Sequence, residues 1–74
     1  MRNFEKYFII KITSELLAYE INYYYKLNKK SIENIEGIYN TIATQIPHKQ
    51  YKNEIINLGI SKAVNLYGIT ALNK

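Results

Sequence analysis

Apolar residues recur every three or four positions along most of the chain, which is the spacing of one face of an α-helix. No segment alternates apolar and polar residues over the length of a β-strand. The pattern is interrupted at residues 28–30, at Pro47, at Gly59 and at Gly68. It therefore predicts a single all-α domain over residues 1–74, a small helical bundle of three main helices plus a short C-terminal fourth helix.

The first helix is expected from about residue 3 to residue 27, with Asn3 as N-cap and Glu5 in the first turn. It carries two apolar stripes. One contains Phe8, Ile9, Ile12, Leu16, Tyr19, Tyr23 and Leu27, and the other contains Tyr7, Ile10, Leu17, Ala18, Ile21, Tyr24 and Tyr25. A helix that is apolar on two sides is either central in its fold, with helices on both sides, or shared with a partner. The second alternative favours a homodimer through this helix.

The second helix is expected over about residues 31–45, with Ser31 as N-cap. Its apolar face contains Ile32, Ile35, Ile38, Tyr39, Ile42, Ala43 and Ile46. Pro47 ends this helix and can begin a third one, over about residues 48–58. Gly59 is expected to end the third helix, because glycine favours helix C-termini. Ser61 is then expected to cap a short fourth helix over about residues 61–67.

Composition limits the chemistry that the chain can perform. The 74 residues include no cysteine, no aspartate and one histidine, which excludes disulfides and thiolate metal sites. His48 follows a proline at a predicted turn, where a solvated side chain is expected rather than a general base. We therefore expect a non-enzymatic protein without catalytic residues, metal or cofactor. Ten Lys and Arg residues against six acidic ones make the chain basic, with a net charge of +4.

The apolar run at residues 7–10 is too short for a signal peptide or a membrane span. We therefore expect no membrane span and a cytoplasmic location. Ile, Asn, Lys and Tyr make up just over half of the residues, and their codons are AT-rich. This bias points to the genome of a bacterium, a phage or a mobile element.

Tyrosine is concentrated near the end of the first predicted helix, next to several lysines. The candidate partner-binding residues are Tyr19, Tyr23, Tyr24, Tyr25, Lys26, Lys29 and Lys30. Tyrosine is enriched at interface hot spots, since it offers a large contact area with a polar tip. The alternative is that codon bias alone explains the tyrosines. The first interpretation predicts a protein that binds and modulates another macromolecule, such as a phage or mobile-element inhibitor that occludes a site of a host system.

Residues 58–68, LGISKAVNLYG, resemble the turn and the recognition-helix start of helix-turn-helix proteins. Gly59, Ile60 and Ser61 match that motif, whereas Ile55 and Asn65 depart from the small and apolar residues it has there. The resemblance implies, as an alternative, a small DNA-binding transcriptional regulator with a degenerate helix-turn-helix at 52–67. Its nucleic-acid contacts would be Ser61, Lys62, Asn65, Lys49 and Lys52.

Residues 38–68 also resemble pediocin-type bacteriocin immunity proteins. The likeness consists of Ile38-Tyr39, Ile42, Ile55-Ile56, Leu58-Gly59 and Leu66-Tyr67-Gly68. It implies an antiparallel helical bundle and an immunity function as a further alternative. It covers under half of the chain, and the first helix of that family has no counterpart here.

Overall fold

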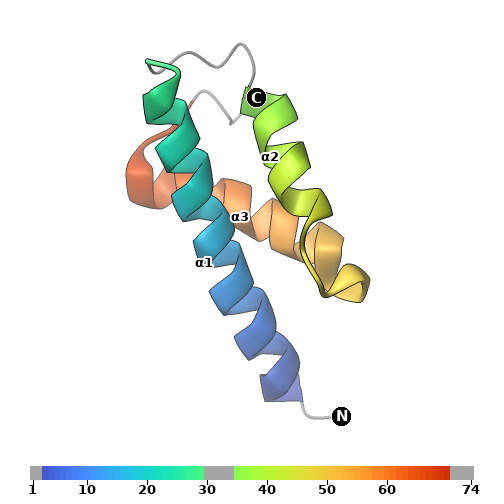
Figure 1. Ribbon diagram of the computed structural model, residues 1–74. Helices are drawn as coiled ribbons and strands as arrows, with labels where there is room; N and C mark the ends of the chain where they lie inside the picture. Colours follow the sequence, from blue (N-terminus) through green and yellow to red (C-terminus); the bar gives the residue numbers. More distant parts are fainter. Residues whose placement is uncertain (1–2, 30–34, 71–74) are drawn as a thin grey trace.

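The computed structural model describes residues 3–29 and 35–70 (Figure 1). The elements in order are α1 (Asn3–Leu27), α2 (Ile35–Thr44), the short 3-10 helix η1 (Lys49–Tyr51) and α3 (Lys52–Tyr67). Figure 1 shows α3 passing behind α1, and α2 lying beside α1. The described ranges hold helices and no strand, which confirms the all-α class.

Helix α1 has the bounds that its apolar spacing predicts. Glu5 lies in the first turn and Lys26 in the last turn, where the helix dipole favours each charge. After Leu27 the chain turns: the Asn28 N–H donates to the Tyr24 carbonyl at 3.0 Å, and Lys29 takes a left-handed conformation with φ +57°. These contacts end the helix without a proline or a glycine.

Helix α2 packs the predicted face against the core. Ala43 is buried, as is Ile46 just beyond the end of the helix, and Ile38, Tyr39 and Ile42 are half-buried against the same cluster. The predicted start of this helix, including the Ser31 cap and Ile32, lies outside the described residues. Beyond Pro47 the chain forms η1 before α3 begins, so the α-helix starts at residue 52 rather than at the predicted residue 48.

The predicted break at Gly59 is wrong. Helix α3 runs without interruption through Gly59 and Ser61, so a separate fourth helix over residues 61–67 is absent and Ser61 is not a cap. The physical reason is packing rather than helix ending, because Gly59 is buried against Leu17 of α1. The helix ends instead at Gly68, whose φ of +70° is the left-handed conformation that glycine favours.

The core lies where small residues let α1 and α3 approach closely. On α3 the buried residues are Ile55, Gly59 and Ala63, four positions apart and therefore on one face. On α1 they are Ile10, Ser14, Leu17, Ala18 and Ile21. An added Cβ at Gly59 would lie 2.6 Å from Leu17 Cδ2. The closeness of α1 therefore favours glycine at this position.

Within residues 3–29 and 35–70, the fold covers one of the two predicted apolar stripes of α1 and leaves the other exposed. Most of the stripe that contains Ile10, Leu17 and Ile21 is buried or half-buried, although Tyr7 and Tyr24 in it are exposed. The stripe that contains Phe8, Ile12 and Leu16 faces away from this core. Helix α1 is therefore not enclosed between two other helices, because α2 and α3 leave one of its apolar sides open.

Candidate protein interface on helix α1

The exposed side of α1 carries a continuous row of large apolar side chains, here called the α1 stripe. It consists of Phe4, Phe8, Ile12, Leu16, Tyr19, Tyr23 and Leu27, each between 39% and 66% exposed. At 100° per residue these positions fall within an arc of about 140°. The five buried positions of α1 fall within about 100° on the opposite side of the helix. The stripe is therefore separated from the core by the body of α1.

Seven large side chains of this kind form an extensive surface. A fully exposed side chain of this size presents about 200 Å². The exposed fractions then amount to about 800 Å², which exceeds the roughly 300–600 Å² of the largest apolar patch on a typical monomer. Patches of this size mark sites that bind another protein, a membrane surface or a ligand.

The predicted partner-binding residues occupy the C-terminal half of the stripe and its margin. Tyr19, Tyr23 and Tyr24 are exposed, and the rings of Tyr23 and Tyr24 meet edge to face at 5.3 Å between centroids. Lys26 and Lys29 are also exposed. Tyr25 differs, since it is half-buried against the core and is not available in the same way. Lys30 lies outside the described residues.

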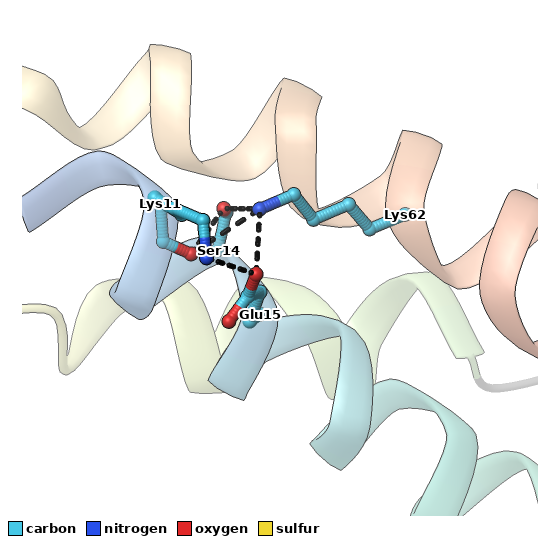
Figure 2. A network of polar contacts seen from close by, with 4 residues as sticks. All are labelled: Lys11, Ser14, Glu15 and Lys62. Atoms are coloured by element: carbon cyan, nitrogen blue, oxygen red, sulfur yellow. Dashed lines mark hydrogen bonds and ion pairs between the residues drawn. The ribbon is translucent and has the colours of Figure 1, made fainter. Parts of the chain in front are cut away.

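A polar network joins α1 to α3 beside the stripe (Figure 2). Lys62 reaches across from α3, and its Nζ donates to Ser14 Oγ at 3.0 Å and to the Lys11 carbonyl at 3.2 Å. Lys62 Nζ also lies 3.6 Å from Glu15 Oε2, and Lys11 Nζ donates to that same oxygen at 3.0 Å. The hydrogen bond from Lys11, with the charges of Lys11 and Lys62, lowers the pKa of the Glu15 carboxyl below its ordinary value.

The network brings together a serine hydroxyl and a lysine amine, the two groups of a Ser–Lys catalytic pair. Its geometry favours a structural role instead. Ser14 is fully buried and donates its own proton to the Lys11 carbonyl, while Lys62 is engaged by the Glu15 carboxylate. A nucleophile needs access to substrate and a base free to accept its proton. These contacts hold α3 in register on α1.

The side chains of the candidate nucleic-acid residues do not form a single exposed surface that could bind nucleic acid. Because α3 is continuous, the segment 52–67 has no turn and lacks the geometry of a helix-turn-helix. The Lys62 ammonium faces α1 rather than solvent, and Asn65 Nδ2 donates to Ser61 Oγ at 3.4 Å. Lys49 lies exposed on η1, and Lys52 is half-buried at the start of α3.

Two further features of the described residues bear on function. A shallow open groove between α1 and α3 is lined by Tyr7, Ile10 and Leu58 together with Glu54, Asn57 and Ser61. It is mostly apolar and open to solvent, unlike the enclosed pockets that hold small ligands.

Among the described residues no three His, Cys, Asp or Glu side chains cluster as a metal site would require, and no helix is long and apolar enough to span a bilayer.

The predicted partner-binding residues include the tyrosines of the stripe but none of the apolar residues in its N-terminal half. Phe4, Phe8, Ile12 and Leu16 belong to the same exposed row as Tyr19. The available signal was the position of the small residues: Ser14 and Ala18 lie one turn apart, and they mark the side of α1 that another helix approaches. The apolar residues on the other side then remain without a partner.

Comparisons with protein-family models, with curated proteins and with solved structures find no match to this chain.

Proposed function

We propose that this chain is a non-enzymatic binding protein that contacts another protein through the α1 stripe. The observation that supports this proposal is the row of seven half-exposed apolar side chains opposite the core. Leaving these side chains, about 800 Å² in all, exposed to water is unfavourable by about 25 cal/mol per Å², so covering them is a strong driving force for association.

The chemistry of the stripe favours a protein as the partner. Tyr19 and Tyr23 are large, have few rotatable bonds and carry hydroxyl tips, which suits a hot spot at a protein interface. Lys26 and Lys29 lie at the same end of α1 and would accelerate the encounter with an acidic surface. We propose that the chain modulates its target by occlusion, with a rigid helix covering the target's own binding site, as expected for a phage or mobile-element inhibitor.

Affinity capture from the native host tests this function. Tagged wild-type chain, the stripe variant Tyr19→Ala/Tyr23→Ala and the control Tyr67→Ala are compared, each with and without nuclease. Tyr67 is 40% exposed on α3, outside the stripe, so its loss controls for removal of a surface tyrosine. Circular dichroism confirms that each variant retains its helices.

The proposal predicts that the wild-type chain captures one protein in stoichiometric amount, with or without nuclease. Its recovery should be unchanged with Tyr67→Ala and at least about tenfold lower with the stripe variant, as expected for a hot spot worth about 1.4 kcal/mol or more. Equal retention by both variants would overturn the proposal. Recovery of nucleic acid alone, lost on nuclease treatment, would overturn it in favour of the DNA-binding alternative.

A further inference from the structure

We infer that the α1 stripe is covered in the free protein by a second copy of this chain, with the two α1 helices packed antiparallel about a two-fold axis near residues 15 and 16. This inference rests on the proposed function, because it takes the stripe as a protein interface and names its occupant. Three properties of the stripe support it: the spacing of its residues, the placement of its charges and its area.

The spacing of the stripe is the same when it is followed from either end. Phe4 and Leu27, Phe8 and Tyr23, and Ile12 and Tyr19 lie equally far from a point between residues 15 and 16, and Leu16 lies beside that point. In an antiparallel pair each apolar side chain therefore meets an apolar side chain of the other copy at the same level. Leu16 packs against its own equivalent at the axis. A symmetric, self-complementary patch is the requirement for a two-fold interface.

The charges within the stripe's arc favour the antiparallel direction. Glu5 lies in the first turn of α1 and Lys26 in the last turn. Antiparallel packing puts Glu5 of one copy level with Lys26 of the other, whereas parallel packing puts each charge opposite its own kind. The helix dipoles also oppose one another in the antiparallel pair. The third charge in the arc, Glu15, faces its equivalent near the axis, but each copy already neutralises it with Lys11 and Lys62.

The available area suits a stable dimer. About 800 Å² of exposed stripe on each copy is close to the roughly 800 Å² per partner of a standard specific interface. Helix α1 has 25 residues and is therefore about 37 Å long. Two helices of this length that cross at about 20° can remain in contact over several turns.

Sedimentation equilibrium over a range of concentrations tests the pairing. The wild-type chain is expected to reach twice the monomer mass of 8.7 kDa as concentration rises. Leu16→Glu places two further carboxylates at the axis and should keep the chain monomeric, while the matched control Leu66→Glu, exposed on α3, should still dimerise. A wild-type chain that stays at 8.7 kDa at every concentration, or a Leu16→Glu variant that dimerises as well as the control, would overturn the inference.

Cysteine cross-linking tests the direction, and the chain has no native cysteine to interfere. Ile12→Cys and Tyr19→Cys chains are mixed and oxidised. The antiparallel pair brings these two positions within the roughly 4.4–6.8 Å between Cα atoms that a disulfide requires, so the mixed disulfide should predominate. A parallel pair separates them by about 10 Å along the helix and would give mainly homodisulfides, which would overturn the proposed direction.

The two proposals fail separately. A monomeric chain that still captures a host protein through the stripe would overturn the second copy as occupant and leave the proposed function standing. A monomeric chain whose stripe variant captures everything that the wild type captures would overturn both. If the dimer forms, a heterologous partner must compete with the second copy, and its apparent affinity should weaken as the concentration of the chain rises.

Discussion

Replacing Gly59 by alanine tests how closely α3 approaches α1. A methyl group at this position would lie 2.6 Å from Leu17 Cδ2 and 3.0 Å from Leu17 Cγ. Leu17 is almost fully buried, so its side chain has little room to move aside. Overpacking costs about 1–3 kcal/mol, whereas alanine in place of a helix-interior glycine stabilises by about 1 kcal/mol. We expect Gly59→Ala to lower the free energy of unfolding by about 1 kcal/mol.

Gly37→Ala is the matched control for this substitution. Gly37 is exposed in α2, and no atom lies within 4 Å of the Cβ that alanine would add. Here the gain in helix propensity acts alone, so the free energy of unfolding should rise by about 1 kcal/mol. For a domain of this size each change corresponds to about 4–8 °C in Tm, with opposite sign in the two variants. Thermal melts followed by circular dichroism, at one fixed low protein concentration, measure both shifts.

A double variant separates steric overlap from a general weakening of α3. Leu17→Ala alone leaves a cavity and should cost about 2–5 kcal/mol. When it is combined with Gly59→Ala, the new methyl group occupies part of that cavity, so the total loss should be smaller than the sum of the two single losses. Additive losses, or a Gly59→Ala variant stabilised as much as Gly37→Ala, would refute the close approach.

Three other substitutions test the network and the stripe. The pKa of the Glu15 carboxyl is lowered, chiefly by the hydrogen bond from Lys11. The ionised carboxylate therefore stabilises the fold fully above the ordinary pKa of 4.5, and this stabilisation is lost as the pH falls through the lowered pKa. The Tm difference between wild type and Glu15→Gln should therefore vanish in acid, and a difference that persists at about pH 2 would contradict this role. Lys62→Met should lower the free energy of unfolding by about 1 kcal/mol in urea titrations, and an unchanged midpoint would show that the network contributes nothing. Leu16→Gln should change the free energy of unfolding by less than about 0.5 kcal/mol in dilute solution, unlike Leu17→Ala at the next position. A loss as large as that of Leu17→Ala would place Leu16 in the core.

The course of α1 could be predicted because its apolar spacing continues without a break through 25 residues. The course of α3 could not, because the local preference of glycine for helix ends conflicts with its use at close helix contacts. Gly59 lies at a close helix contact and Gly68 at a helix end, although similar residues surround both in the sequence. What separates them is the contact of Gly59 with Leu17, which lies in another helix.

The candidate interface was predictable in composition but not in orientation. Both stripes of α1 are apolar, so hydrophobicity alone does not determine which one the fold covers. The side that carries Ser14 and Ala18 is covered, since small side chains allow α3 to come close. The contact between Lys62 and Ser14 joins residues 48 positions apart, and no spacing rule within one helix reaches that far.

Hydroxyl-radical footprinting of three tyrosines at increasing protein concentration tests most directly whether another chain covers the α1 stripe. In the isolated chain Tyr19 is 57% exposed, Tyr23 is 52% exposed and Tyr67 is 40% exposed, so labelling should follow that order in dilute solution. When the stripe is covered, Tyr19 and Tyr23 should be protected while Tyr67 is unchanged, so the order inverts at high concentration. Labelling of Tyr19 and Tyr23 that exceeds that of Tyr67 at every concentration, and in host extract, would contradict the account.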